Sequence, residues 1–184
     1  MSDTRFKSDL LNITNYSTMS AMNMVKTGIG FDVHSFAPGR ALIIGGVNIP
    51  HEMGLMGHSD ADVLTHAVID AIVGVTLSKD IGRLFPDTDM NYKNANSLIL
   101  LQEAIRQVYA AGYNIGNVDA VIIAQTPKMS PYIDAMRINL SVTIGINTED
   151  ITIKATTTEY LGFTGRKEGI AAVAVANVWR QGGA

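Results

Sequence analysis

The sequence contains no cysteine among its 184 residues. This absence excludes disulfide bonds, thiolate metal sites and cysteine nucleophiles, so any bound metal ion must be held by histidine, aspartate or glutamate. The chain also lacks a cluster of basic residues, and its formal net charge of -3 argues against a nucleic-acid-binding groove. No apolar run reaches the roughly 18 residues of a membrane-spanning helix. We therefore expect neither a nucleic acid nor a membrane as a partner.

Several common catalytic motifs are missing too. The sequence has no Walker loop, no GxSxG and no HExxH. Gly28-Ile29-Gly30 is not a dinucleotide-binding fingerprint, because neither a third glycine nor a helix follows it. The chain length suits one domain, which would bury roughly 70% of its unfolded surface and would need no structural metal to fold.

The order of the expected elements indicates the fold class. Strands are expected at 28–34, 41–44, 117–125, 151–156 and 169–179, with 47–50 completing a hairpin, and helices at 61–75, 96–111 and 130–144. Ser59 or Asp60 is expected to cap the first helix and Ser130 the third, while 51–60, 79–89 and 159–165 are expected to be loops. Because strands and helices do not alternate strictly, we predict a single α+β domain with helices on one face of a mixed β-sheet.

Residues 1–26 are rich in Ser, Thr, Asn and Met and show no sustained hydrophobic period. They lack the long apolar segment of a secretory signal peptide. We interpret them as an N-terminal extension, which is a leader, a linker remnant or a tag, and place the domain at 27–184. This interpretation predicts a cytoplasmic protein if the source is bacterial, and a plastid-type organelle if the extension belongs to a leader.

Three residues indicate a metal site. In a strand, Asp32 and His34 project to the same side because they are two positions apart. His66 lies within the helix expected at 61–75, and elements close in sequence usually pack together. One carboxylate and two imidazoles leave a coordination position open, as in a catalytic zinc site. Asp62 or Asp70, one turn away on either side, could accept the second ring N–H of His66. The alternative is that His66 is a hydrogen-bonded core residue and Asp32 a strand-end cap.

Hydroxyl and cationic side chains gather on loops and strand ends in the second half of the chain. Lys128, Arg166 and the threonines at 156–158 suit phosphate oxygens, and Glu159 could add a carboxylate for Mg²⁺. An acidic loop offers further groups for hydroxyls or a metal, namely Asp80, Asp87 and Asp89. Solvated turns and ordinary acidic loops are the alternative for each of these residues.

Five segments in order resemble those of the 2-C-methyl-D-erythritol 2,4-cyclodiphosphate synthase family: GFDVH at 30–34, GHSDADVLTHA at 57–67, DIGRLFPDTD at 80–89, NVDAVIIAQTPKM at 117–129 and KATTTEYLGFTGRKEGIA at 154–171. The resemblance covers about residues 27–180. It implies a homotrimer with active sites between neighbouring subunits. It also implies a phosphorus–oxygen lyase of the non-mevalonate route of isoprenoid (terpenoid) biosynthesis. Such an enzyme closes 4-diphosphocytidyl-2-C-methyl-D-erythritol 2-phosphate to 2-C-methyl-D-erythritol 2,4-cyclodiphosphate and releases CMP by intramolecular phosphoryl transfer.

The resemblance implies roles for individual residues. Asp32, His34 and His66 match the ligands of one zinc ion, and Glu159 matches the residue that meets Mg²⁺ or Mn²⁺ bound with the substrate diphosphate. His58 and Thr157 match residues that stabilise the transition state. The other matches are substrate contacts: Ser59, Asp80, Ile81, Gly82, Phe85, Pro86, Asp87, Thr88 and Asp89 at the methylerythritol and phosphate end; Ala124, Gln125, Thr126, Pro127, Lys128, Met129 and Ser130 around the cytidine, from the neighbouring subunit; and Thr156, Thr158, Phe163 and Arg166.

Two features depart from the family pattern. Family members often carry an acidic residue in the last strand, facing a cavity on the trimer axis where isoprenoid diphosphates sit, and this chain has Val173 there. Phe31 and Arg166 still match positions at that cavity, so such a diphosphate is a further expected partner if the cavity tolerates the missing carboxylate. Residues 1–26 match nothing in single-domain members. The alternative functions are another metal-dependent phosphoesterase and a non-catalytic trimer that binds isoprenoid diphosphates.

Overall fold

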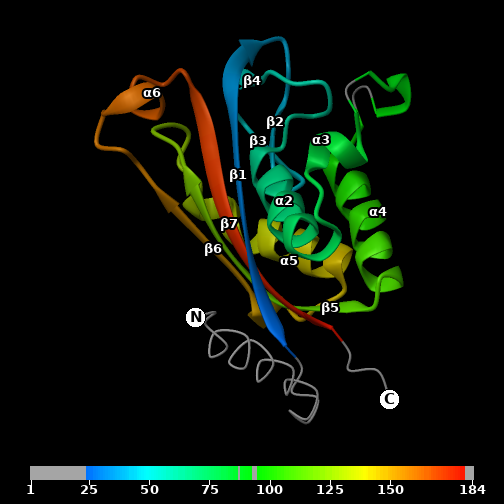
Figure 1. Ribbon diagram of the computed structural model, residues 1–184. Coiled ribbons are helices and arrows are strands. Elements are labelled where there is room, and N and C mark those ends of the chain that lie inside the picture. The colour runs from blue at the N-terminus through cyan, green and yellow to red at the C-terminus, as the bar shows by residue number, and fades with distance from the viewer. Residues whose placement is uncertain (1–23, 87, 93–94, 181–184) are drawn as a thin grey trace, which may run out of the picture.

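The computed structural model describes residues 24–180, except for 87, 93 and 94. Most of the expected N-terminal extension therefore lies outside the described residues. Strand β1 (Val25–Pro38) begins slightly before the domain boundary expected at residue 27. It is a long strand that pairs with another strand on each side (Figure 1).

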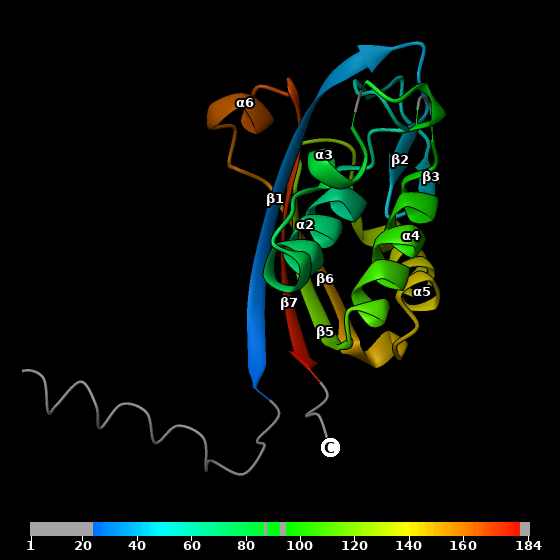
Figure 2. The same ribbon diagram turned by 45° about the vertical axis from the view of Figure 1, so that its right-hand side comes forward.

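The described chain is built around one twisted, mixed sheet (Figures 1 and 2). Its strands lie in the order β4 (Met53–Leu55), β1, β7 (Gly169–Arg180), β5 (Tyr113–Ile123) and β6 (Ile151–Thr156). Only the pair of β5 and β6 is parallel; the other neighbouring pairs in this sheet are antiparallel. The predicted α+β class and mixed sheet are confirmed.

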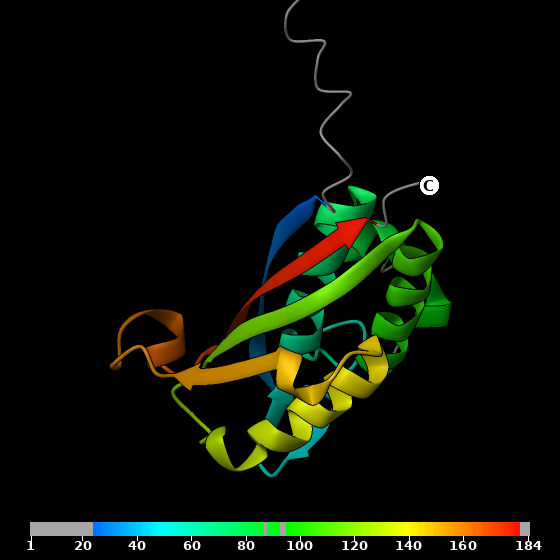
Figure 3. The ribbon, with the colours of Figure 1, turned by 90° about the horizontal axis from the view of Figure 1, so that it is seen from below.

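Three helices, α2 (Val63–Leu77), α4 (Ser97–Ala110) and α5 (Ile133–Ile144), lie on one face of the sheet, as the view from below shows (Figure 3). α2 packs on β1 and β7, and α4 packs on α2. β2 (Leu42–Ile44) and β3 (Val47–Ile49) form the predicted hairpin beside them. Among the described helices, none has both the length and the apolar character needed to cross a bilayer.

Two glycines in β1 let this strand approach α2 closely. A Cβ atom at Gly30 would lie 2.0 Å from the carbonyl oxygen of Ala67, and Gly28 faces the same helix one turn further along. Since any other residue would overlap the helix backbone here, glycine sets the distance between the two elements. The close approach brings His66 of α2 against the part of β1 that carries Asp32.

The start of α2 differs from the prediction. Asp62 caps the helix, with its side chain accepting a hydrogen bond from the backbone of Thr65. The expected caps Ser59 and Asp60 were wrong, because Ala61 has a φ of 58° and turns the chain away from a helical path before Asp62.

Several short elements were not predicted. Segment 51–60 contains β4, whose Leu55 pairs with Phe36 at the end of β1. Segment 79–89 contains α3 (Ile81–Leu84), which Asp80 caps, and 159–165 contains α6 (Gly162–Gly165). Such elements depend on tertiary pairing or a single cap rather than on a hydrophobic period, so the pattern of the sequence does not indicate them. Short 3₁₀ turns occupy Met90–Tyr92, Ser130–Tyr132 and Thr148–Asp150.

The expected helix at 130–144 is divided. Its first residues form the 3₁₀ turn at Ser130–Tyr132, and α5 follows it. Ser130 is not the cap that we predicted: Met129 holds the cap position of the turn, and no side chain bonds to the free amides. β5 also begins at Tyr113 instead of 117 and ends at Ile123, which leaves Ala124 and Gln125 in the following loop.

Candidate active site

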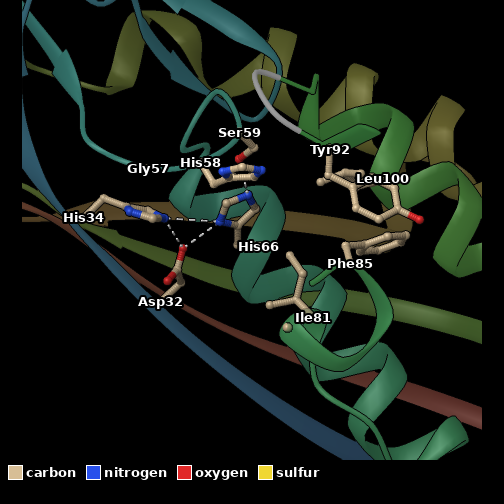
Figure 4. A pocket seen from close by; sticks show the side chains of 11 residues that line it. Asp32, His34, Gly57, His58, Ser59, His66, Ile81, Phe85, Tyr92 and Leu100 are labelled. Carbon is tan, nitrogen blue, oxygen red and sulfur yellow. Dashed lines mark hydrogen bonds and ion pairs between the residues drawn. The ribbon is translucent and has the colours of Figure 1, made fainter. Parts of the chain in front are cut away.

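A cluster of three potential metal ligands forms where β1 meets α2 (Figure 4). One carboxylate oxygen of Asp32, Oδ2, lies 3.0 Å from His34 Nε2 and 3.0 Å from His66 Nδ1. The two ring nitrogens are 3.2 Å apart. The structure therefore brings together the three residues that strand alternation and helix position had suggested.

The charges within this cluster influence one another strongly. Burial alone would raise the pKa of the Asp32 carboxyl, but hydrogen bonds and attraction from His34 and His66 outweigh it and place this pKa well below its usual range. Burial would lower the pKa of His66, but Asp32 and the neighbouring carboxylates raise it above its ordinary value. Without a metal ion, the cluster therefore stabilises positive charge between its side chains.

The donor set fits a divalent cation that accepts nitrogen and oxygen ligands. The three donor atoms lie within 4.8 Å of one another. In a tetrahedral site with bonds of about 2.0–2.1 Å, donor atoms are about 3.3–3.4 Å apart, close to the spacing of this cluster. When both imidazoles are neutral and each turns a bare nitrogen toward Asp32, these lone pairs and the carboxylate suit a bound cation.

The second ring nitrogen of His66 points to the start of α4. His66 Nε2 lies 2.9 Å from Ser97 Oγ and 3.2 Å from Ser59 Oγ. The hydroxyl of Ser97 in turn donates a hydrogen bond to the carboxylate of Asp60. Ser97 is completely buried and the carboxylate of Asp60 is partly buried, so the bond between Ser97 and His66 is shielded from water.

The predicted partners of this nitrogen, Asp62 and Asp70, were wrong. Asp62 accepts hydrogen bonds from the backbone of Gly45 and Gly46 at 2.8 and 2.7 Å, in addition to capping α2. Asp70 accepts one from the backbone of Ile81 at 2.7 Å. Although both lie one helical turn from His66, each is occupied in joining α2 to a neighbouring loop.

The cluster lies at one end of a pocket with a volume of about 250 Å³. Besides the cluster, its walls come from the loop before α2, from α3 and from the start of α4: Gly57, His58, Ser59, Ile81, Gly82, Phe85, Tyr92 and Leu100 (Figure 4). The rings of Phe85 and Tyr92 pack edge to face with centroids 5.2 Å apart. The pocket thus has a charged end and an apolar wall.

Hydrogen bonds from Arg40 hold the loop that contains His58. The guanidinium of Arg40 donates hydrogen bonds to the carbonyl oxygens of Gly57, at 3.0 Å, and of Ser59. His58 Nε2 is buried, and no described atom is its hydrogen-bond partner. An unpaired buried nitrogen is uncommon in a folded protein, and the residue that carries it lines the pocket.

A second pocket, of about 370 Å³, lies past the ends of β5 and β6. Its lining contains most of the expected cytidine segment together with two of the threonines: Ala124, Gln125, Pro127, Lys128, Met129, Ser130, Ala155, Thr156 and Thr157. Thr157 Oγ1 donates to Glu159 Oε1 at 2.8 Å. The two pockets share no lining residue, so within one chain the metal cluster and Lys128 lie in separate pockets.

The remaining expected contacts lie outside both pocket linings. Asp80 accepts from the backbone N–H of Arg83 at 2.8 Å as the cap of α3. Arg166 forms an ion pair with Glu168 at 2.8 Å, and Phe163 is partly exposed on α6. Thr158 bonds to residues of the same turn, and other predicted contacts stay outside the linings: Pro86, Thr88, Asp89 and Thr126. Asp87 lies outside the described residues.

Comparison with known proteins identifies the family. The YgbB family matches residues 25–179. The chain belongs to the YgbB family. The 2-C-methyl-D-erythritol 2,4-cyclodiphosphate synthase of Haemophilus influenzae (strain PittGG) is 59% identical over 158 residues, which cover 86% of this chain and 100% of that protein. The synthase of Enterococcus faecalis (strain ATCC 700802 / V583) is 55% identical over 153 residues, which cover 83% of this chain and 98% of that protein.

Solved structures of YgbB-type proteins share the fold. The bifunctional IspDF of Campylobacter jejuni has a TM-score of 0.83 and 46% identity over 86% of this chain and 43% of that one. IspF of Plasmodium falciparum in complex with CDP has a TM-score of 0.76 and 34% identity, covering 88% of this chain and all of that one. This chain thus spans less than half of the bifunctional protein. The family resemblance seen in the sequence is confirmed.

Sequence reasoning missed three polar residues behind the pocket of this YgbB-family domain. Asp60 was interpreted only as a cap, Ser97 only as a helix start, and Arg40 was not singled out. The roles of Ser97 and Asp60 depend on α4 packing against the loop before α2, a contact between residues 37 positions apart. A serine at a helix start is so common that its residue type gives no signal of a second task.

Proposed function

We propose that this chain converts 4-diphosphocytidyl-2-C-methyl-D-erythritol 2-phosphate to 2-C-methyl-D-erythritol 2,4-cyclodiphosphate and CMP. The observation that carries this proposal is the partly buried cluster of Asp32, His34 and His66 at the end of a pocket, in a chain 59% identical to a synthase of that name. In this reaction an oxygen of the 2-phosphate bonds to the β-phosphorus. The bond from the β-phosphorus to the bridging oxygen breaks, and CMP leaves with its electron pair.

The cluster fits zinc, because it offers nitrogen and oxygen donors and no thiolate. Zinc held by Asp32, His34 and His66, and Mg²⁺ or Mn²⁺ held with the help of Glu159, would supply positive charge to the oxygens of the diphosphate. A phosphate nucleophile is already anionic near neutral pH, so the chain needs no strong general base. Its own task is to position the reacting groups and to exclude water.

The residues around the cluster suit that task. His58 lines the pocket from a loop held by Arg40, and a phosphate oxygen bound there would give its unpaired ring nitrogen a partner. Phe85 and Tyr92 form an apolar wall for the methylerythritol carbon chain. Holding nucleophile and electrophile in one folded substrate can lower a barrier by about 7–11 kcal/mol. Thr157 would then stabilise charge on the diphosphate from the other pocket.

The separation of the two pockets supports an active site shared between subunits of a homotrimer. The sheet face opposite the helices supplies an apolar surface: Ile29, Phe31 and Val33 of β1 are 72%, 56% and 42% exposed. Exposed apolar surface of this kind is typical of a subunit interface. In such a trimer the Lys128 pocket of one subunit would bind the cytidine of a substrate whose diphosphate lies at the His66 pocket of the next.

The axial cavity expected from the family resemblance would lie on the same face. Phe31 is paired in register with Val173, and Arg166 forms an ion pair with Glu168. We propose that an isoprenoid diphosphate binding there would rely on Arg166 and the apolar side chains, because Val173 supplies no carboxylate.

The direct test is to incubate the purified protein with the substrate, Mg²⁺ and Zn²⁺ in ¹⁸O-labelled water and follow the products by phosphorus NMR and mass spectrometry. The expected products are CMP and the cyclic diphosphate, both without ¹⁸O. Product that contains ¹⁸O would indicate a hydrolytic phosphoesterase instead. If neither CMP nor cyclic diphosphate forms, the proposal is wrong.

A further inference from the structure

A chain of hydrogen bonds, buried at His66 and Ser97 and partly buried at its far end, connects the metal cluster to a carboxylate that does not belong to it. It runs from His66 Nε2 to Ser97 Oγ, 2.9 Å away, and from the Ser97 hydroxyl to Asp60 Oδ1. The other carboxylate oxygen of Asp60 accepts the backbone N–H of Ser97 at 3.0 Å. The carboxylate of Asp60 therefore accepts hydrogen bonds from both the hydroxyl and the backbone N–H of Ser97.

The direction of the protons in this chain follows from what each group can do. A carboxylate only accepts, and each group that touches Asp60 here is a donor, including the backbone N–H of Asp62 at 3.3 Å. The Ser97 proton is consequently committed to Asp60, and the Ser97 oxygen faces His66 with a lone pair. The hydrogen between His66 Nε2 and Ser97 Oγ must then be bound to His66 Nε2, which donates it to Ser97. In a neutral imidazole, the other nitrogen, Nδ1, is left bare.

The bare nitrogen is the one that faces the cluster. His66 Nδ1 is the atom 3.0 Å from Asp32 and 3.2 Å from His34 Nε2. Ser59, the other neighbour of Nε2, accepts from the backbone of Ala61 and is held at 3.2 Å, so it adds a weaker contact without fixing a proton direction.

We propose, resting on the metal site proposed above, that Asp60 and Ser97 are positioning residues that hold His66 in the tautomer able to bind the metal. The same two residues join the loop of His58 to α4, since the backbone N–H of Asp60 also donates to Ala95 O at 3.1 Å. Orientation of the metal ligand and of the substrate-binding loop is thereby set by one partly buried carboxylate. Removing such a partner of a metal-bound histidine typically weakens metal binding 10- to 100-fold.

Asp60→Asn is the most informative variant. If the new amide accepts the Ser97 hydroxyl through its oxygen, the NH₂ group of the amide faces the backbone N–H of Ser97. Two donors then face each other without an acceptor. If the amide turns, its NH₂ donates to Ser97 Oγ, and the Ser97 hydroxyl then donates to His66 Nε2. The proton of a neutral His66 moves to Nδ1, which can no longer bind the metal. The volume of the side chain is almost unchanged.

The experiment measures zinc affinity by chelator competition and the His66 tautomer by ¹⁵N NMR of the metal-free protein, at a pH above the raised pKa of His66 where its imidazole is neutral, for wild type, Asp60→Asn, Ser97→Ala and Ser97→Thr. We expect zinc affinity about 10- to 100-fold lower in Asp60→Asn, with His66 protonated on Nδ1. Ser97→Ala should lose affinity within the same range, and Ser97→Thr, which keeps the hydroxyl, should restore it.

Asn96→Ala is the matched control. It removes the cap of α4, where Asn96 Oδ1 accepts the Leu98 N–H at 2.8 Å, but leaves the chain of bonds to His66 intact. Its zinc affinity should stay within about twofold of wild type. An equal loss in this control, or wild-type affinity and an unchanged tautomer in both Asp60→Asn and Ser97→Ala, would overturn the proposed role. If the wild-type protein binds no zinc, the metal site itself is wrong.

Discussion

The His66 pocket and the Lys128 pocket of this YgbB-family domain are built in opposite ways. The His66 pocket is made from β1, α2 and a loop held by Arg40, and its polar side chains are buried or partly buried, with Asp32, His34 and His66 bonded to one another. The Lys128 pocket lies past the ends of β5 and β6, and Lys128, Thr157 and Glu159 are exposed. Packing inside one chain is enough to place the first set of groups. The second set lacks such support, which is why a neighbouring subunit is expected to complete it.

The largest effect is expected from His66→Ala in the first pocket. The variant should lose both zinc and turnover, the latter by roughly 10³-fold or more, because a group that stabilises charge in the transition state is removed. Alanine suits a helix, so the fold should persist. Metal analysis, circular dichroism and the rate of CMP release check this. A folded variant with full zinc content would remove His66 from the ligand set.

Mixed trimers test whether the two pockets, on neighbouring subunits, form one active site. Lys128→Ala alone should lower kcat/KM about 10- to 150-fold, the worth of a hydrogen bond to a charged group, and leave zinc content unchanged. Equal mixing of Lys128→Ala and His66→Ala subunits should recover about a quarter of wild-type activity, because a closed ring of three then holds one intact shared site in every mixed trimer. Activity no higher than the average of the separate variants would show that the pockets do not cooperate between subunits.

Gly30→Ala tests how closely β1 and α2 must approach. Its new Cβ would lie 2.0 Å from the carbonyl oxygen of Ala67, so the helix must shift. We expect a loss of about 1–3 kcal/mol in the free energy of unfolding and weaker zinc binding. The control is Gly74→Ala on the exposed side of α2, where the nearest contact is 3.9 Å away and alanine should add about 0.4–1 kcal/mol. Denaturant titration measures both, and equal stability of the two variants would contradict this account.

The smallest effect concerns pH and the metal-free protein. The raised pKa of His66 stabilises the folded state fully below its unfolded pKa near 6.5, and this stabilisation is lost as pH rises through the raised value. The lowered pKa of Asp32 stabilises it above about pH 4, and this contribution is lost as pH falls further. Metal-free wild type should therefore exceed Asp32→Asn in stability most clearly between about pH 4 and 6.5. A difference that does not vary with pH in unfolding experiments would contradict it.

The sequence predicted the first pocket better than the second. Strand alternation placed Asp32 and His34 together, and helix position added His66, because these relations are local or between neighbouring elements. The glycines of β1 also indicate that another element approaches this strand closely, which the prediction did not include. The link from Ser97 to Asp60 could not be foreseen, since it depends on how α4 packs against a distant loop.

The second pocket was predicted only through family resemblance. Lys128, Thr156 and Thr157 follow strand ends at which polar residues are common, so their type and spacing do not distinguish a site from a solvated turn. Their grouping around one cavity appears only when β5 and β6 are paired in parallel, so that their carboxyl ends meet. The same holds for β4, whose three residues gain stability only by pairing with β1.

Anomalous diffraction at the zinc absorption edge, from crystals of the protein grown with zinc and CDP, tests the central claim most directly. We predict one strong peak per chain within about 2.0–2.2 Å of Asp32 Oδ2, His34 Nε2 and His66 Nδ1, with the nucleotide against Lys128 of the adjacent subunit. No peak at this cluster, or a zinc ion bound elsewhere while the three side chains remain hydrogen-bonded to one another, would contradict the account.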